Sequence, residues 1–269
     1  MLIKPNKVFN FAKSCLKKLN LDEKKSSRIA ELLVKSDMSN HFSHGVIRLI
    51  QYHNMVKDKI YKPSNDPSAK KKGSLLLVDG NRAFGQVSMY FACEKIKKIN
   101  KEIQVTSVIN TGHIGRLSDY SENLSKAGFI NLIFCNGGGP NTSIYPSRER
   151  LVGTNPFSAG IPIGYKRDFI VDFATSMLAE GKINLARLNK KRLTNKPIIN
   201  QKGIFSNNAA ELYSGGSLAT FGGIKGSAFC LLNEILGGQM ISNNNPTDKN
   251  YLDGNNCLII TIKKKLFNY

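Results

Sequence analysis

The sequence predicts an α/β protein in which a helical N-terminal region precedes a domain of alternating strands and helices. In the first 60 residues apolar side chains recur at helical spacing, and from residue 75 onward short apolar runs alternate with helical stretches. Hydrophobic residues fill 41% of the 269 positions, which is enough for a sizeable core. We therefore expect a helical region at residues 1–72 and an α/β domain at residues 73–269.

Three helices are expected in the N-terminal region. Asp22 is a suitable N-cap for the second helix and Ser43 for the third. In the third helix His44 and Arg48 would be four residues apart and would share a face, with His44 in the anion-favouring first turn. The apolar stripes of the three helices are Val8, Phe9, Phe11 and Leu16; Ile29, Leu32 and Leu33; and Val46, Ile47, Leu49, Ile50, Met55 and Val56.

The remaining elements follow a stretch that has the composition of a linker. Residues 61–73 contain two prolines and a lysine run, which indicates a loop. Beyond them, strands that alternate with helices are typical of an α/β domain. Strands are expected at residues 75–78, 105–109, 130–135, 161–163, 169–173 and 258–262, and helices at residues 84–99, 117–127, 176–188 and 226–236.

The formal charge of +20 raises the question of a nucleic-acid partner. The lysines are spread along the whole chain in twos and threes and do not alternate with aromatic residues. This pattern indicates solvated lysine surfaces, and no nucleic-acid partner is expected.

Targeting and cysteine patterns favour a cytoplasmic protein. No run of about 18 apolar residues is present, and residues 1–6 lack the apolar core of a signal peptide. We expect neither a membrane span nor membrane binding. The five cysteines are far apart and form no C-x-x-C pair, so reduced and mostly buried thiols are expected.

Two polar, glycine-flanked histidines are the leading candidates for chemistry. His44 lies between Ser43 and Gly45 with Arg48 nearby, and His113 lies in a loop between an expected strand and an expected helix. Histidine exchanges protons near neutral pH, and arginine offers a planar fork for a carboxylate. In open α/β sheets such strand ends are where ligands bind. The pattern predicts an enzyme that acts on a small organic acid, although His113 is equally well explained as a residue in a turn.

Several other sites are excluded by spacing. His41 and His44 have H-x-x-H spacing but lack a third ligand, so no metal is expected. The chain contains no G-x-S-x-G and no G-x-G-x-x-G. Lys225 follows two glycines without forming a P-loop, yet it could meet a phosphate or carboxylate at a helix start.

The order of these blocks resembles the malate/L-lactate/sulfolactate dehydrogenase family, which is unrelated to the Rossmann-type lactate dehydrogenases. The resemblance covers nearly the whole chain and is greatest for the hydroxycarboxylate dehydrogenase branch. The matching blocks are Ser43-His44-Gly45 with Arg48; Val78-Asp79-Gly80 with Phe84-Gly85-Gln86; Gly112-His113-Ile114-Gly115-Arg116; residues 151–157; Asp172-Phe173-Ala174-Thr175-Ser176 with Ala179-Glu180-Gly181-Lys182; and residues 221–226.

The resemblance implies a non-Rossmann fold with a central mixed-sheet cofactor domain, and usually a homodimer with the active site near the subunit interface. It implies an NAD(P)-dependent 2-hydroxy-acid dehydrogenase, with NAD favoured over NADP. His44 would donate the proton, with His113 as the rival candidate. Arg48 would bind the substrate carboxylate, and Ser43 would contact the substrate or orient His44. The cofactor-site residues implied are Asn155, Asp172, Thr175, Ser176, Lys182 and Lys225.

The chain also departs from the family pattern. Residues 203–208 lack the family's usual Asp-Pro, and Ile224 stands where a His or Tyr is frequent. Family members continue with C-terminal helices beyond the point corresponding to residue 269, so the cofactor domain is expected to be shortened. A second hypothesis is therefore a weakly active or non-catalytic binding protein on the same scaffold.

Overall fold

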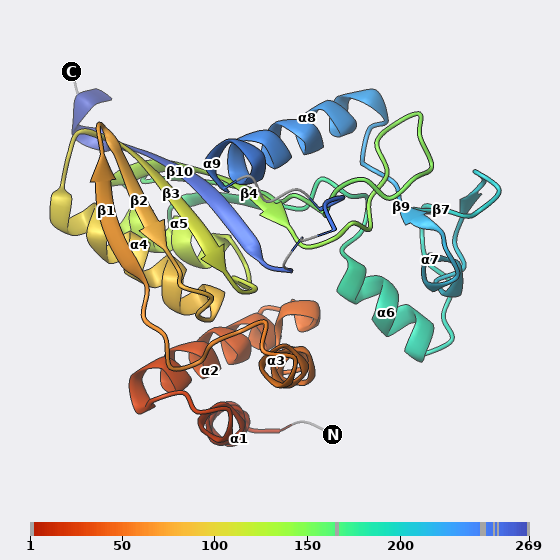
Figure 1. The fold of residues 1–269 in the computed structure, drawn as a ribbon, viewed down its shortest axis with the longest axis horizontal. Coiled ribbons are helices and arrows are strands. Elements are labelled where there is room, and N and C mark those ends of the chain that lie inside the picture. The colour runs from red at the N-terminus through yellow and green to blue at the C-terminus, as the bar shows by residue number, and fades with distance from the viewer. Residues whose placement is uncertain (1–2, 165–166, 243–245, 250, 252, 268–269) are drawn as a thin grey trace.

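The computed structural model describes residues 3–164, 167–242, 246–249, 251 and 253–267. It consists of stacked layers, with N-terminal helices below, a large sheet in the middle and one long helix above (Figure 1). The predicted α/β class is confirmed. In the described part of the chain, no helix is both long and apolar enough to cross a membrane. The five cysteines are free thiols, and four of them are buried, as expected.

Three α-helices and a short 3-10 turn form the N-terminal layer. These are α1 (Pro5–Lys18), α2 (Glu23–Met38), η1 (Phe42–His44) and α3 (Arg48–Lys57). The predicted cap of α2 is confirmed, because the Asp22 carboxylate accepts a bond from the Lys25 N–H at 2.7 Å. Leu16, Ile29 and Tyr52 are fully buried in the core of this layer, which Phe84 also joins. Phe11, predicted in the apolar stripe of α1, is instead 61% exposed.

The expected third helix does not begin at Ser43, so that prediction is wrong. Ser43 and His44 belong to η1, and the α-helix begins only at Arg48. The break occurs at Gly45, where a Cβ atom would collide with the Asp37 carboxylate, which also accepts a bond from the Val46 N–H at 3.0 Å. His44 therefore does not lie in the first turn of an α-helix and does not share a helical face with Arg48.

The central sheet has seven strands in the order β1-β2-β3-β10-β4-β5-β6. Only the β2–β3 pair is parallel among the described strands, so the sheet is mixed, as the resemblance implied. The strands are β1 (Ser68–Lys72), β2 (Leu75–Asp79), β3 (Ile103–Thr111), β4 (Phe129–Gly137), β5 (Phe157–Ile161), β6 (Phe169–Phe173) and β10 (Asn255–Lys263).

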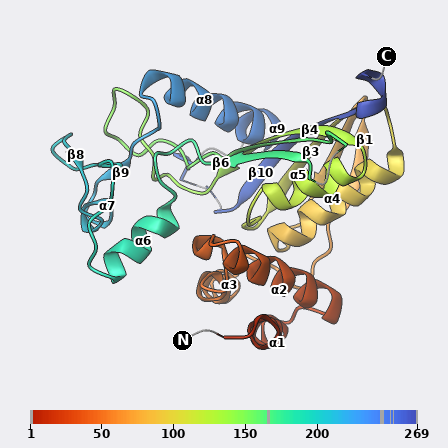
Figure 2. The ribbon, with the colours of Figure 1, turned by 180° about the vertical axis from the view of Figure 1, so that it is seen from behind.

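Helices cover both faces of this sheet (Figures 1 and 2). On one face α4 (Gly85–Ile99) and α5 (Ser118–Lys126) lie between the sheet and the N-terminal helices, and on the other lies α8 (Ile224–Glu234). The main core forms between the sheet and the helices α4 and α5, where Met89, Tyr120 and Ile133 have no exposed surface. The helix α8 continues through a π turn (Ile235–Gln239) into α9 (Met240–Ser242), and η3 (Lys264–Phe267) follows β10.

A smaller unit lies at the end of the molecule opposite β1 (Figure 1). Its three-stranded sheet has the order β8-β7-β9 and packs with α6 (Glu180–Leu188) and α7 (Ala210–Tyr213) around Ile183, Ile198 and Leu218. The strands β7 (Ile198–Ile199), β8 (Phe205–Ser206) and β9 (Ser217–Leu218) have two residues each, which is too short for a visible sequence pattern.

Several element boundaries correct the sequence predictions. The expected linker at residues 61–73 contains β1, a fully exposed edge strand with three lysines, and lysines on an edge discourage pairing with other chains. The fifth strand spans Phe157–Ile161 rather than residues 161–163, and α6 begins at Glu180, four residues later than expected. The division of the chain at residue 72 stays a prediction.

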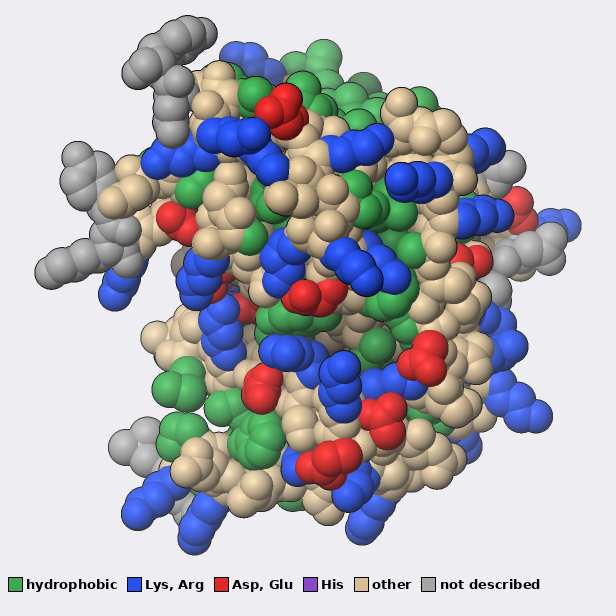
Figure 3. All heavy atoms as spheres, turned by 90° about the vertical axis from the view of Figure 1, so that its left-hand side faces the viewer, with side chains coloured by type: hydrophobic (Ala, Val, Ile, Leu, Met, Phe, Trp, Pro, Cys, Tyr) green, Lys and Arg blue, Asp and Glu red, His purple; other side chains and the backbone are tan. Residues whose placement is uncertain are grey.

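Figure 3 shows how the surplus positive charge is distributed over the β1 side of the molecule. Lys and Arg side chains occur over the whole face, and Asp, Glu and apolar side chains lie between them. This face has the dispersed basic surface that the sequence predicted rather than a continuous basic stripe.

Replacement of Gly85 by alanine is expected to destabilise the protein and to displace the His113 loop. A Cβ atom at Gly85 would lie 2.2 Å from the Gly112 carbonyl oxygen and 2.5 Å from the His113 carbonyl carbon. Overpacking of this kind costs about 1–3 kcal/mol. Urea unfolding would measure the loss. Lys98→Ala is the control, because Lys98 is exposed near the end of the same helix; equal stability of wild type and Gly85→Ala would contradict the prediction.

Candidate active site

One cleft of about 510 Å³ collects most of the predicted site residues. Its walls come from η1, α3, the loop after β3, the loop after β4, and the segment from β6 to α6. The predicted residues that line it are Ser43, His44, Arg48, His113, Asp172, Ser176 and Lys182. Segments far apart in the sequence thus meet at one concave surface of the size that small-molecule sites have.

The η1 turn holds His44 beside Arg48. Ser43 Oγ lies 3.0 Å from His44 Nδ1, which leaves Nε2 as the ring nitrogen available to a ligand. Arg48 Nε donates to the Ser43 carbonyl oxygen at 2.6 Å, and one terminal nitrogen donates to Gln51 Oε1 at 2.7 Å. These two bonds fix the plane of the guanidinium and leave its remaining N–H groups for an anion.

His113 lies directly beyond the carboxyl end of β3, as predicted. Its backbone N–H donates to Tyr61 Oη at 2.7 Å, and its Nδ1 lies 3.1 Å from Tyr52 Oη. Gln86 Nε2, from α4, donates to the same Tyr52 oxygen at 2.5 Å. The ring orientation is therefore set by α3 and α4, and Nε2 is again left for a ligand. The helix expected at residues 117–127 begins one residue later, at Ser118.

The two histidine rings stack at the centre of the site. Their centroids are 5.7 Å apart and their planes differ by 26°. Burial is the main cause that lowers the pKa of His44, to about 3, and the positive charges of Arg48, Arg116 and Lys182 lower it further. Burial and Arg48 also lower the pKa of His113 well below its ordinary value. Both imidazoles are therefore neutral near pH 7 in the free protein.

The start of α6 fits tightly against η1. A Cβ atom at Gly181 would lie 2.6 Å from Ser43 Cβ, so only glycine permits this approach. The contact places Lys182, in the first turn of α6, at the exposed edge of the cleft near His44. The predicted cofactor residue Lys182 and the predicted substrate residues therefore share one wall.

A glycine-rich loop after β4 forms another wall. Gly137, Gly138 and Gly139 line the cleft, and they offer backbone groups without side chains. Asn155 supports this loop from behind: its Oδ1 accepts from the Gly137 N–H at 3.0 Å, and its Nδ2 donates to Glu234 at 2.8 Å. Asn155 is thus buried one layer behind the cleft surface.

Three more predicted cofactor residues, Asp172, Thr175 and Ser176, lie at or just after the end of β6. Asp172 accepts a bond from the Ser118 N–H at 2.8 Å, and Ser176 Oγ donates to the Leu178 carbonyl at 3.0 Å. Thr175 is fully buried, with its hydroxyl bonded to the Thr154 carbonyl oxygen at 2.9 Å. Asp172 and Ser176 therefore reach the cleft directly, whereas Thr175 holds the strand end in place.

Comparison with known proteins identifies this architecture. The family described as malate/L-lactate dehydrogenase matches residues 3–268, almost the full chain. The chain belongs to the malate/L-lactate dehydrogenase family. The hydroxycarboxylate dehydrogenase B of Escherichia coli K12 is 28% identical over 237 residues, which are 86% of this chain and 66% of that relative. The chain thus spans just under two thirds of that relative's length.

Two further relatives show the same likeness. The malate dehydrogenase of Pyrococcus abyssi is 30% identical over 248 residues, 88% of this chain and 67% of that one. The solved structure of the sulfolactate dehydrogenase of Methanocaldococcus jannaschii matches with a TM-score of 0.84 and 26% identity, over 99% of this chain and 79% of that one.

The structure excludes one predicted residue from the site and reveals others that were not predicted. Lys225 lies exposed in the first turn of α8 and outside the cleft, so the structure does not bring it to the other predicted residues. Sequence reasoning assigned no role to Tyr52 or Gln86, because both are embedded in apolar helical stretches and no spacing links them to His113. Arg116 belongs to the motif that contains His113, but only the fold shows that it lines the cleft.

Proposed function

We propose that this protein is an oxidoreductase that interconverts a small 2-oxo acid and the corresponding 2-hydroxy acid with NAD(H) or NADP(H). The observation that carries the proposal is the pair of stacked, neutral histidines beside the Arg48 guanidinium in one cleft. Membership of the malate/L-lactate dehydrogenase family supports it. Relatives named hydroxycarboxylate and malate dehydrogenases fit an α-hydroxy acid as the substrate class.

The cleft has the features that a nicotinamide dinucleotide requires. The Gly137–Gly139 loop exposes bare backbone, and a Cβ atom at Gly153 behind it would come within 2.2 Å of the loop's carbonyl oxygens. Asp172, Ser176 and Lys182 would hold the cofactor, with the cationic Lys182 suited to its phosphates. When bound, the cofactor supplies or accepts the hydride at the substrate's α-carbon. We infer NAD rather than NADP, and a homodimer, as parts of the same proposal.

In this proposal Arg48 binds the α-carboxylate of the substrate. Its guanidinium is held in plane by the Ser43 carbonyl and by Gln51, so little side-chain freedom is lost when the carboxylate binds. The carbonyl oxygen of the substrate then faces the histidine pair. His44 transfers the proton to that oxygen during reduction, and His113 Nε2 contacts the same oxygen and helps to orient it.

Substrate charge provides a means to protonate His44 when it is needed. Burial is the largest cause of the low pKa of His44, and the cations Arg48, Arg116 and Lys182 lower it further. A bound anion offsets the contribution of these charges, which favours protonation of His44 when the 2-oxo acid binds. In the reverse direction the neutral imidazole is already the base that the hydroxy acid needs.

A panel of 2-oxo acids, each tested with NADH and with NADPH, would test the proposed function. We expect oxidation of at least one reduced cofactor, followed at the nicotinamide absorbance, with at least one 2-oxo acid. Direct titration with NADH and NADPH should show binding in the micromolar to millimolar range. A folded protein that binds neither cofactor at millimolar concentration would contradict the proposal and favour a non-catalytic binding protein on this scaffold.

A further inference from the structure

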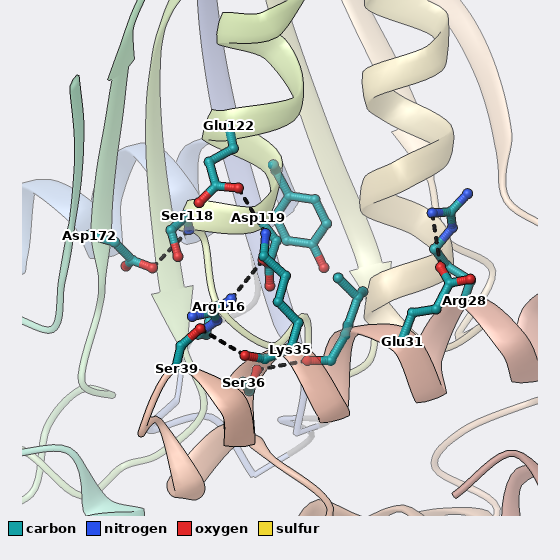
Figure 4. Close-up of polar contacts among 12 residues, drawn as sticks. Arg28, Glu31, Lys35, Ser36, Ser39, Arg116, Ser118, Asp119, Glu122 and Asp172 are labelled. Carbon is teal, nitrogen blue, oxygen red and sulfur yellow. Dashed lines mark hydrogen bonds and ion pairs between the residues drawn. The ribbon is translucent and has the colours of Figure 1, made fainter. Parts of the chain in front are cut away.

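Arg116 is a buried cation in the wall of the cleft. It lies between β3 and α5, and 9% of its surface is exposed. It lines the same cleft as Arg48 and contributes to the positive potential at His44. Figure 4 shows it between the start of α5 and the end of α2, beside Asp119 and Lys35. The cleft therefore has two arginines, of which the α-carboxylate of a substrate needs one.

Asp119 positions Arg116 without depending on it. The Asp119 carboxylate, 2% exposed, bonds a terminal nitrogen of Arg116 at 2.8 Å. The same carboxylate also pairs with Lys35 Nζ at 2.7 Å (Figure 4). Lys35 also pairs with Glu122 at 2.8 Å, so the two cations face two carboxylates. The pairing with Asp119 fixes the Arg116 side chain in one orientation.

The guanidinium of Arg116 has unused hydrogen-bonding capacity. In the described part of the chain, its hydrogen bonds go to Asp119 alone, although a guanidinium has five N–H donors. Its Nε is buried without a partner. An unsatisfied buried donor of a charged group carries a free-energy penalty, which an anionic ligand in the cleft would relieve.

From these observations we propose that Arg116 binds a second anionic group of the substrate. The cleft would then select 2-oxo and 2-hydroxy acids that carry a distal carboxylate, with Arg48 on the α-carboxylate and Arg116 on the distal one. The proposal rests on the proposed function and names the substrate class of the same site. A monocarboxylate would leave the Arg116 donors unsatisfied, so the site discriminates against it.

Oxaloacetate and 2-oxobutyrate form a matched pair for the test, because they differ by a carboxylate in place of a methyl group. We expect the wild type to favour oxaloacetate, and Arg116→Gln to lower the ratio of the two kcat/KM values by about 100-fold. Arg116→Lys keeps the charge and should restore part of the ratio. Asp119 keeps Lys35 in both variants, so the fold is expected to persist.

Arg28→Gln is the matched control. Arg28 also pairs with an acid three residues on, Glu31 at 3.3 Å, but this exposed pair lies away from the cleft (Figure 4). In Arg28→Gln the ratio of kcat/KM for oxaloacetate to kcat/KM for 2-oxobutyrate should equal that of the wild type. An unchanged ratio in folded Arg116→Gln would overturn the proposal for Arg116 while leaving the proposed function intact.

A binding measurement separates failure of this proposal from failure of the proposed function. If the protein reduces no 2-oxo acid, the proposed function fails, and calorimetry with L-malate and 2-hydroxybutyrate still tests Arg116. Preferential binding of L-malate that is lost in Arg116→Gln would support the distal anion site. Equal affinities for the two acids in the wild type, or no binding of either, would overturn it.

Discussion

His44→Ala is expected to lower kcat for 2-oxo-acid reduction by about 1000-fold, because general acid catalysis by a positioned side chain is worth about 10²–10⁴-fold. His44 is half-buried, and its Nδ1 bonds only Ser43, the adjacent residue. Its removal breaks no hydrogen bond between layers and loses only the ring stacking with His113 there, so the protein should fold with a modest loss of stability. Steady-state kinetics with the best 2-oxo acid, together with thermal unfolding, would measure both effects.

The pH dependence distinguishes the proton donor from its rival. His44 has a pKa of about 3 in the free protein, so above that value reduction requires a proton that the free imidazole does not carry. In the wild type kcat/KM for reduction should fall as pH rises, whereas kcat/KM for oxidation should not rise with pH between about 5 and 8. His44→Ala should remove the slope in reduction. If His113→Ala removes it and His44→Ala does not, His113 is the donor.

Arg48→Gln is expected to lower kcat/KM for every 2-oxo acid by about 100- to 1000-fold, mainly through KM. Loss of a charged partner that is shielded from water costs about 2–5 kcal/mol, in the range of this factor. Arg48 also lowers the pKa of both histidines, so its removal should raise the pKa of each. Substrate-dependent kinetics and NMR titration of the imidazoles would measure the two effects.

Two variants control the Arg48 prediction. Arg48→Lys retains the charge but not the planar fork, so it should recover only part of the lost kcat/KM. Lys57→Gln removes a positive charge from the exposed last residue of the same helix and should have no effect on KM. A KM in Arg48→Gln equal to that of the wild type would exclude Arg48 as the carboxylate-binding residue.

The elements that could be predicted from the sequence are the long ones. The 15 residues of α4 and the nine residues each of β3 and β4 bury enough apolar positions for their periodicity to be read. The strand β1 could not be read in this way, because all five of its residues are exposed and its pairing depends on β2. The two-residue strands β7, β8 and β9 are likewise set by tertiary contacts.

In the site, too, local features could be predicted from the sequence and long-range contacts could not. His44 and Arg48 were found through their local setting, but their geometry was not, because the break at Gly45 depends on Asp37 in the preceding helix. Tyr52 and Gln86 could not be linked to His113 from sequence, since they lie 61 and 27 positions away from it along the chain. Tyr52 reaches His113 only when the layers stack, and Gln86 acts on it only through Tyr52. Long-range contacts of this kind have no signal in a single sequence.

The bond between Tyr52 and His113 has a further consequence for how the site comes into being. Tyr52 belongs to the N-terminal helices and His113 to the sheet, so the two stacked imidazoles come from different layers of the molecule. Neither layer by itself contains both imidazoles. If His44 and His113 act together as proposed, we expect activity to be lost when the layers separate, before the helices and strands themselves melt.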